Sequence, residues 1–347
     1  MLTLLIIICA VILFFAVFED YIEEKYKWFS FILIAICLMM YAGLRPVGFD
    51  RDSHNYYINF IHSDTTELME PAFLLISSIC YHIVQDVHSL FLVFATIGVS
   101  LVFISIKRLT PLKFLPILVY MMNLYPLHEL TQIRAGVASG LFLFSLIYIS
   151  EGKKIFAFVC ILLACFFHIS ALVLFPILFL SNKPFSWKWR LALNAAVPVC
   201  VVFYYLDIDF ITLIPISFIS EKIELYKHVN DFGDIEKARL MSPFPLIKIF
   251  FFVYLTYFAD TIKEYVSSTY LLIKVLGISI VAYFAFASFP IMSMRLSELY
   301  GIVEIVTFPC LIFTISPKIV GRLFVCIIAL IELIYNLAIN QLLNFDA

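Results

Sequence analysis

Charged residues are scarce in this sequence, and their scarcity excludes most soluble proteins. Only 14% of the 347 residues are Asp, Glu, Lys or Arg, whereas 63% are hydrophobic. Soluble domains carry roughly 25% charged residues. We therefore expect an all-α polytopic membrane protein whose surroundings are the lipid bilayer. The formal net charge of −2 leaves no basic excess for nucleic acid, so we expect no nucleic-acid partner.

Several chemical signatures are also absent. The eight cysteines form no C-x-x-C pair and lie in apolar runs, so we interpret them as packing residues rather than a disulfide or metal framework. No Gly-rich phosphate loop and no metal-ligand spacing occurs, so we expect neither a metal nor a cofactor. The first apolar run, 2–18, has no basic segment before it and no small-residue cleavage site, which favours a retained span over a signal peptide.

Most of the sequence consists of apolar runs between short polar breaks. At roughly 1.5 Å per residue, about 20 residues cross the hydrocarbon core as a helix. The runs lie at 2–18, 28–44, 71–84, 89–106, 112–127, 132–150, 155–180, 191–206, 243–259, 271–289, 301–316 and 321–340. Run 71–84 is too short and too polar for a regular span. Run 155–180 is too long for one untilted helix and has a break at His168.

Basic loops set the expected orientation, because the cytoplasmic loops of membrane proteins are enriched in Lys and Arg. Such loops occur at 23–27, 107–113, 151–154, 181–190 and 317–322. All of them can be cytoplasmic if 155–180 crosses twice, as two short helices with His168 at the outer turn, and if 71–84 is interfacial or re-entrant. We therefore expect one membrane domain, 1–347, with both termini outside and about 12 transmembrane helices, within a range of about 11 to 14.

This orientation places two polar segments outside the membrane, a first extracytoplasmic loop at 45–88 and a longer one at 207–242. Lysine predominates among the cations inside, whereas five arginines and all seven histidines fall outside. A guanidinium matches phosphate oxygens bidentately, while an ammonium does not. The outer arginines therefore indicate binding of an anion.

The stretch GLRPVGFDRDSHNYY, residues 43–57, follows directly on an apolar run. It concentrates ionisable and aromatic residues at one water boundary: Arg45, Asp50, Arg51, Asp52, His54, Tyr56 and Tyr57. The simplest interpretation is an interfacial loop, with tyrosines among the lipid headgroups and charges that neutralise one another. The coincidence with further clusters along the chain favours a functional site.

A second cluster lies in LHELTQIRAGVASG, where His128 and Gln132 precede Arg134 at the outer end of a helix. An arginine at the centre of a membrane helix costs at least ~2.5–3.5 kcal/mol, so it usually faces a cavity or a partner. The alternative is an arginine that extends to the interface. Gly136 and Gly140 form a small-residue face that allows a neighbouring helix to approach closely.

Three further segments carry candidates. His168 and Ser170 lie at the proposed outer turn, although a single membrane histidine is more often a packing residue than a catalyst. Arg295 and Glu298 are one helical turn apart, and a simple ion pair between them is an equal alternative. Glu70 is an additional acidic candidate.

Several separated outer helix ends thus present an arginine with carboxylates and histidines nearby, which favours an outward-facing pocket for a phosphorylated, lipid-anchored ligand. Over residues 28–310, the order and spacing of these motifs resemble the EpsG/Wzy-type bacterial polysaccharide polymerases. The resemblance is carried by Arg45-x-x-Gly48-x-Asp50, Tyr56/Tyr57, Glu70-Pro71, Gln132-x-Arg134, Phe167-His168-x-Ser170-Ala171-Leu172 and Arg295. Each motif is short, and the specificity lies in the series.

The resemblance implies a metal-independent, GT-C-like glycosyltransferase that joins O-antigen or exopolysaccharide repeat units. It would be a multi-pass protein of the bacterial cytoplasmic (inner) membrane with its site facing the periplasm or exterior. The donor would be a glycan on undecaprenyl pyrophosphate and the acceptor a lipid-linked repeat unit. A chain-length regulator would be a further partner.

Attack by a sugar hydroxyl needs a general base, and departure of a pyrophosphate needs nearby cations. Asp50, Asp52 and His168 are the candidates for the base, and we favour an aspartate, because the outer arginines favour an ionised carboxylate. The distance from Asp52 to Tyr56 matches the family motif. The distance from Gly48 to Asp50 also matches it, so both aspartates remain candidates for the base. The residues expected to bind substrate or pyrophosphate are Arg45, Arg51, Arg134, Arg295, Gln132, His128, Tyr56, Glu70, Ser170 and Glu298.

Two other classes of protein remain as alternatives. A flippase or transporter of lipid-linked sugars should show paired halves with interrupted helices at matched positions, and the sequence shows no such symmetry. A membrane acyltransferase that modifies surface polysaccharide would also use histidine and arginine.

Overall fold

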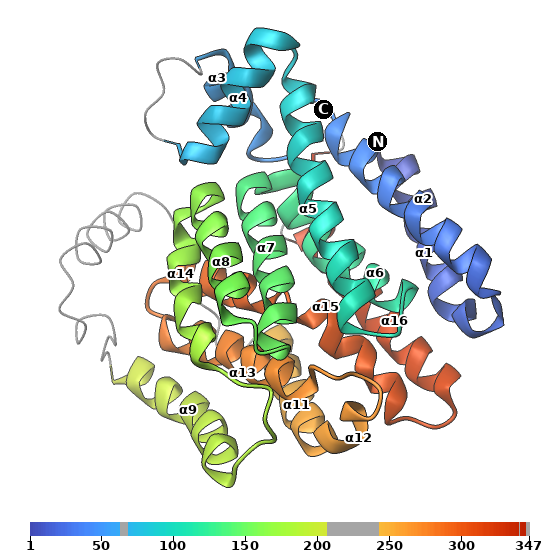
Figure 1. Cartoon of the computed structure of the whole chain (residues 1–347), viewed down its shortest axis with the longest axis vertical. Helices are drawn as coiled ribbons and strands as arrows, with labels where there is room; N and C mark the ends of the chain where they lie inside the picture. Colours follow the sequence, from blue (N-terminus) through green and yellow to red (C-terminus); the bar gives the residue numbers. More distant parts are fainter. Residues whose placement is uncertain (63–68, 207–242, 340, 345–347) are drawn as a thin grey trace. The chain divides into compact units, whose positions relative to one another are not determined.

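The computed structural model describes residues 1–62, 69–206, 243–339 and 341–344 (Figure 1). Over these residues the regular elements are all helices, and the only extended pairing is an isolated bridge between Asp50 and Leu343. The all-α prediction is therefore confirmed. The predicted extracytoplasmic loop at 207–242 lies outside the described residues.

The chain forms two compact units. Unit 1 comprises Met1–Asn182, Asp260–Thr269 and Glu304–Ala347, and unit 2 comprises Lys183–Ala259 and Tyr270–Val303. The helices of unit 1 are α1 (Leu2–Phe18), η1 (Glu19–Tyr21), α2 (Glu24–Gly43), α3 (Ser53–Ile61), α4 (Pro71–Ile83), α5 (Val87–Leu109), α6 (Phe114–Val119), η2 (Tyr120–Leu124), η3 (Pro126–Thr131), α7 (Ile133–Ser150), α8 (Lys154–Phe167), η4 (Ile169–Phe179), α15 (Glu304–Thr307), η6 (Phe308–Phe313), α16 (Lys318–Ile334) and η7 (Tyr335–Ile339). Unit 2 contains α9 (Trp187–Tyr205), α11 (Pro243–Tyr257), most of α13 (Thr269–Ala285) and α14 (Pro290–Gly301), while α12 (Ala259–Lys263) lies at a boundary.

Among the described residues, five helices are long and apolar enough to cross a membrane, or six if one bent pair forms a single span. The five are Leu2–Tyr21, Glu24–Gly43, Val87–Leu109, Ile133–Ser150 and Lys318–Ala338. Other apolar runs form helices of 10–17 residues, which is shorter than the roughly 20 residues that a straight span needs. The chain is a multi-pass membrane protein, and the higher count expected from the sequence depends on these shorter helices.

Helix α7 packs closely between its neighbours in unit 1 because glycines lie on its surface (Figure 1). A Cβ at Gly136 would lie 2.6 Å from the carbonyl oxygen of His128, and one at Gly140 would lie 3.1 Å from the Cβ of Leu101 on α5. The predicted small-residue face is therefore confirmed. It fixes the first turns of α7 against η3 and α5.

We expect Gly136→Ala to destabilise the protein, because the added methyl group would meet backbone rather than a movable side chain. Overpacking of this kind costs about 1–3 kcal/mol, so the purified protein in detergent should unfold at a lower temperature. Ser139→Ala on the same helix is the matched control. The Ser139 hydroxyl is buried without a partner in the described part of the chain, so its removal should not lower the unfolding temperature. Equal unfolding temperatures for Gly136→Ala and the wild type would contradict the close contact.

Several segments that were predicted to share the cytoplasmic side meet at one end of unit 1. Ion pairs join them: Arg322–Asp20 (2.8 Å), Lys113–Glu24 (2.9 Å) and Arg108–Glu151 (2.6 Å). The α1–α2 turn, the α5–α6 loop, the α7–α8 turn and the start of α16 are therefore held together, as a shared side requires.

The first loop, the N-terminus and residues 341–344 lie together elsewhere in unit 1. Figure 1 shows the N-terminus near the α3 and α4 end of α5, away from the turn that joins α1 to α2. The backbone N–H of Asn344 donates to the carbonyl of Phe49 (2.7 Å), and Nε of Arg51 donates to the carbonyl of Gln341 (3.2 Å). Residues 341–344 therefore hold the loop that follows α2.

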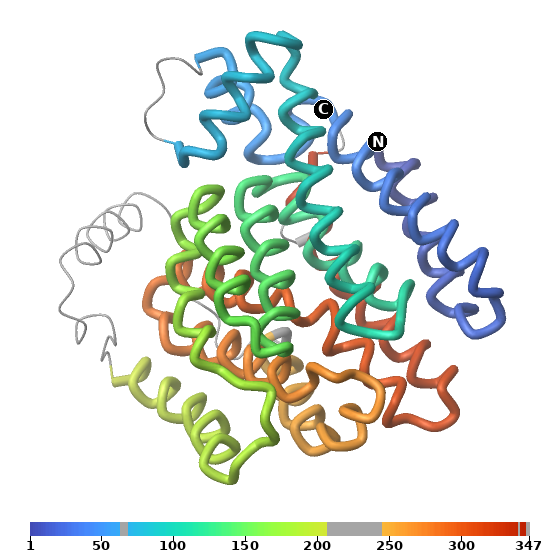
Figure 2. The backbone as a smooth tube through the Cα atoms, viewed as in Figure 1, coloured from blue at the N-terminus to red at the C-terminus, as the bar shows by residue number. Residues whose placement is uncertain are grey.

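Residues 154–179 form a helical hairpin whose backbone can be followed in Figure 2. Helix α8 ends at Phe167, His168 is extended, and the chain continues as the 3₁₀-helix η4. The rings of Phe158 and Phe175 lie 5.4 Å apart, so the two legs fold back against each other. The predicted pair of short helices with His168 at their turn is confirmed.

The first loop contains a helix that the sequence pattern did not predict. Oδ1 of Asp50 accepts the backbone N–H groups of Asp52 (3.0 Å) and Ser53 (2.9 Å), which satisfies two donors where α3 begins. Tyr56 and Phe60, one turn apart, are both buried. A local cap and a short apolar face thus produce a helix within a polar stretch.

Helix α4 contains 13 residues and is about 20 Å long, which is shorter than the hydrocarbon core. Its Phe73 and Ser77 are buried, whereas Leu75 and Ile79 on the opposite side are exposed. This length is compatible with the interfacial or re-entrant segment predicted at 71–84.

Unit 2 also contains a close helix contact. A Cβ at Gly277 on α13 would lie 2.8 Å from the ring of Phe252 on α11, and the hydroxyl of Ser279 donates to the carbonyl of Ser297 on α14 (2.7 Å). These contacts join three helices into one body, in which α14 carries the predicted site residues Arg295 and Glu298.

Candidate functional site

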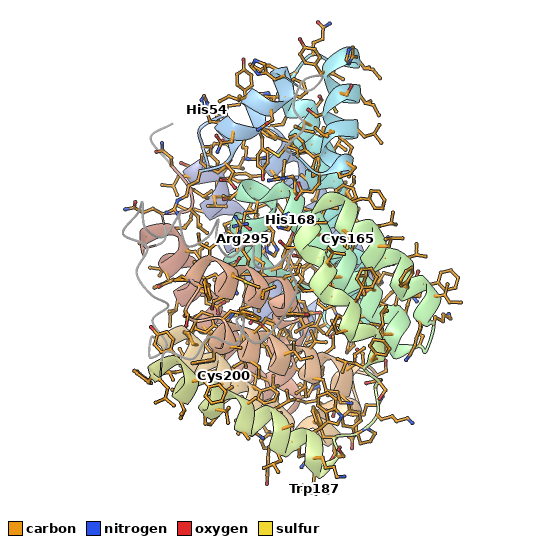
Figure 3. All side chains as sticks on the ribbon, turned by 90° about the vertical axis from the view of Figure 1, so that its left-hand side faces the viewer. His54, Cys165, His168, Trp187, Cys200 and Arg295 are labelled. Atoms are coloured by element: carbon orange, nitrogen blue, oxygen red, sulfur yellow. The ribbon has the colours of Figure 1, made fainter. Side chains whose placement is uncertain are left out.

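Three of the predicted site residues come together within unit 1: Glu70, Arg134 and His168. Glu70 directly precedes α4, Arg134 is the second residue of α7, and His168 (φ −153°, ψ 114°) forms the turn between α8 and η4. The cluster is thus built from three helix ends that are far apart in the sequence, and His168 is labelled in Figure 3.

Glu70 connects the other two side chains. Its Oε2 pairs with Nη1 of Arg134, and its Oε1 lies 3.0 Å from Nδ1 of His168. The side chains of Glu70, Arg134 and His168 are 12%, 22% and 16% exposed. Partial burial lowers the local dielectric and strengthens these charge-assisted contacts, while some surface remains open to a ligand.

Aromatic rings pack beside the arginine of the cluster. The guanidinium carbon of Arg134 lies 5.8 Å from the ring centres of both Tyr56 and Phe73, which are 5.7 Å from each other. This distance allows a cation–π attraction. Burial raises the pKa of Tyr56 to about 12, so its hydroxyl stays protonated. Tyr56 therefore supports the cluster as a neutral side chain.

The charge of Glu70 is fixed by its neighbours. Burial alone raises its pKa, but the hydrogen bond from His168 and the positive charge of Arg134 outweigh burial and lower the pKa from 4.5 to about 2. A carboxylate with a lowered pKa stabilises the folded state fully above its unfolded pKa, and this contribution is lost as the pH falls from 4.5 towards 2. Glu70 is thus an ionised acceptor at neutral pH.

The ionised state of Glu70 decides which nitrogen of His168 carries hydrogen. A carboxylate can only accept, so Nδ1 of His168 must be the donor in their bond. In the neutral ring, Nε2 then holds a lone pair and can take a proton. Glu70 would also stabilise the imidazolium that results. A histidine oriented by a carboxylate is a usual form of general base.

Asp50 is buried in an ion pair. Its carboxylate pairs with Nε of Arg45 at 2.9 Å, and both side chains are 0% exposed. Arg45 also donates to the carbonyl of Ala42 (2.6 Å), and its guanidinium lies 4.1 Å from the ring centre of Phe91. This placement supports structural roles for Asp50 and Arg45 in place of the base and the anion contact expected from the sequence.

We expect Asp50→Ala to reduce the amount of protein in the membrane, because breaking a buried ion pair costs about 3–5 kcal/mol. The double variant Arg45→Met with Asp50→Asn removes both charges and keeps an oxygen for the backbone N–H groups of α3. It should restore the amount of protein and the polymer made per molecule. If the protein is restored but makes no polymer, Asp50 or Arg45 has the role in base catalysis or anion binding that the sequence predicts.

Several other predicted residues of unit 1 also lie at helix ends. Gln132 (φ −98°, ψ 60°) joins η3 to α7, Ser170 lies in the first turn of η4, and Asp52 directly precedes α3. His128 is 2% exposed, and its Nδ1 has no partner among the described residues. Arg51 holds the C-terminal segment. Their roles in binding, like those of Arg295 and Glu298 in unit 2, stay predictions.

One buried acid was missed by the sequence reasoning. Glu129 is 1% exposed, and its Oε1 accepts the hydroxyl of Tyr120 at 2.8 Å. The signal was present, because Glu129 is the only acidic residue between Asp86 and Glu151, and an acid in an apolar stretch needs a partner.

Metal ligands do not gather in the described part of the chain, where no group of three or more His, Cys, Asp or Glu side chains could hold an ion. The eight cysteines are free thiols, and six of them are buried. Free, buried cysteines fit the interpretation as packing residues.

The helices and the cluster define a multi-pass helical membrane protein whose site combines a carboxylate-oriented histidine with an arginine. The chain belongs to the EpsG family, whose model matches residues 27–344. EpsG is a family of Wzy-type polysaccharide polymerases, so the resemblance in the motifs is confirmed. The comparisons with curated proteins and with solved structures gave no match.

Proposed function

We propose that this chain is the glycosyltransferase that joins undecaprenyl-pyrophosphate-linked repeat units into O-antigen or exopolysaccharide. The observation that carries the proposal is the Glu70–Arg134–His168 cluster, because it places a base beside a cation. Family membership supports a polysaccharide polymerase. We place the site at the outer face of the cytoplasmic membrane, in a GT-C-like fold of about 12 crossings that includes the shorter helices.

In the proposed reaction, the acceptor hydroxyl gives its proton to Nε2 of His168 while its oxygen attacks the anomeric carbon of the donor glycan. The bond from that carbon to the pyrophosphate breaks, and its electron pair leaves with the lipid pyrophosphate. Arg134 stabilises the charge of this leaving group. Glu70 keeps His168 in the reactive tautomer and holds Arg134 in place. The leaving group is already activated, so the reaction needs no nucleotide, and arginine can supply the charge without a metal.

Reconstitution tests this proposal. Purified protein in liposomes should convert a purified lipid-linked repeat unit into a ladder of longer chains and release undecaprenyl pyrophosphate. A strain that lacks the protein should accumulate single lipid-linked repeats at the outer surface. Repeats trapped inside would identify a flippase instead, and full-length chains that lack a substituent would identify an acyltransferase.

A further inference from the structure

Glu129 lies on the segment that leads into α7, five residues before Arg134. We propose that Glu129 is a positioning residue, which anchors this segment so that Arg134 meets the anionic group of the substrate. The inference rests on the proposed function of Arg134. It assigns Glu129 a role through its contacts, and no step of the reaction involves its charge.

The carboxyl group of Glu129 is held against two neighbours. Tyr120 donates to Oε1 at 2.8 Å. On the other side lies Gly98 of α5, where an added Cβ would be 2.4 Å from Oε2 and 2.7 Å from Oε1. A larger residue at this position would force the carboxyl group of Glu129 to move. The side chain of Glu129 is thus a buried contact between η3 and α5.

The backbone around Glu129 explains why such an anchor is needed. η2 and η3 are π-helical, a rare conformation that often occurs at functional sites. Gln132 then leaves helical geometry before α7 begins. The regular α-helical hydrogen bonds therefore do not carry through from η3 to Arg134, and side-chain contacts must fix the geometry.

A second contact holds the same segment from the α7 side. The carbonyl of His128 lies where a Cβ of Gly136 would approach to 2.6 Å. Residues 128 and 129 are thus fixed between α7 and α5. A shift of this segment would move the first turn of α7, and with it the guanidinium that pairs with Glu70.

The experiment uses full-length protein reconstituted with the lipid-linked repeat unit, and the amount of folded protein is measured for each variant. Gly98→Ala should raise the KM for the donor and reduce kcat/KM by about tenfold or more. Adding Glu129→Asp, which shortens the side chain by one methylene, should recover at least about threefold of that loss. Gly321→Ala, where the added Cβ would lie 3.1 Å from the Cα of Ile312 in another helix contact of unit 1, is the matched control and should have a smaller effect.

Substitutions at Glu129 separate contact from charge. Glu129→Gln keeps the shape and an oxygen for Tyr120, so kcat/KM should stay within about threefold of the wild type, whereas Glu129→Leu should lose about tenfold. A Gln variant as inactive as the Leu variant would overturn the proposal, because the charge itself would then be required. Equal losses for Gly98→Ala and Gly321→Ala would also overturn it. Failure of the proposed function looks different, because the reconstituted wild-type protein would then make no polymer. Failure of the proposed site would leave Arg134→Ala and His168→Ala active.

Discussion

Glu70→Gln is expected to stop polymer formation as completely as His168→Ala does. Arg134 donates to one oxygen of Glu70, so the glutamine amide must turn its oxygen toward the arginine. Its NH₂ group then faces Nδ1 of His168, which has to accept. The hydrogen of the neutral ring moves to Nε2, and the nitrogen that should take the proton becomes a donor. A change of one atom therefore removes the base without removing the histidine.

The expected loss is about 10²–10⁴-fold in the rate of chain extension, the usual contribution of a general base. Protein levels must be measured in parallel, because Glu70→Gln also weakens a largely buried ion pair. His54→Ala, at an exposed position on α3, is the matched control and should extend chains normally. Chain extension at the wild-type rate in His168→Ala, together with an inactive Asp52→Asn, would identify Asp52 as the base.

Arg134→Lys is expected to lose most polymer formation although the charge is kept. An ammonium cannot hold Glu70 and a phosphate oxygen with the planar geometry of a guanidinium. Loss of one charge-assisted hydrogen bond, worth about 1.5–3 kcal/mol, corresponds to about 10–100-fold in kcat/KM. The loss should appear in assays with the lipid-linked repeat unit at normal protein levels.

Arg108→Lys provides the control for this substitution. Arg108 pairs with Glu151 at a partly exposed site among the loops predicted to be cytoplasmic, where such a pair is worth at most about 1 kcal/mol. Polymer formation should be unaffected. Near-normal activity in Arg134→Lys and in Arg134→Ala would leave Arg134 as a structural residue and remove the cation from the proposed mechanism.

The sequence predicted elements where one local pattern determines the conformation. Run 155–180 exceeds one membrane crossing, is interrupted by a polar residue and lies between two basic loops, so a turn at His168 follows from these local features together. Gly136 and Gly140 lie four residues apart, which gives a small face on any helix. By contrast, α3 was missed because its local cap at Asp50 and its two buried aromatic residues are short signals within a polar stretch. The π-helical segments were missed because the contact between Glu129 and Gly98 joins residues far apart in the sequence and has no local signature.

The site was predicted as a set of residues but not as a set of contacts. An arginine in an apolar helix needs a partner, yet nothing local identifies Glu70, which is 64 residues away from Arg134. Asp50 and Glu70 look alike in sequence, because each is an acid near an outer helix end. Burial separates them: Asp50 is 0% exposed and fully engaged, whereas Glu70 keeps 12% of its side chain open. Side-chain burial is set by tertiary packing, which the pattern does not encode.

The pairing of residues 341–344 with the first loop affects how the protein should be handled. An affinity handle or fluorescent reporter fused after Ala347 would disturb the hydrogen bonds that residues 341–344 make with Phe49 and Arg51. These bonds lie next to the buried Arg45–Asp50 pair. A handle inserted after Gly152 would leave these hydrogen bonds intact, because this glycine lies in an exposed turn (φ +77°) with nothing within 4 Å of its Cβ position. Activity measured with C-terminal fusions would therefore underestimate the native enzyme, and an internal handle should be the reference.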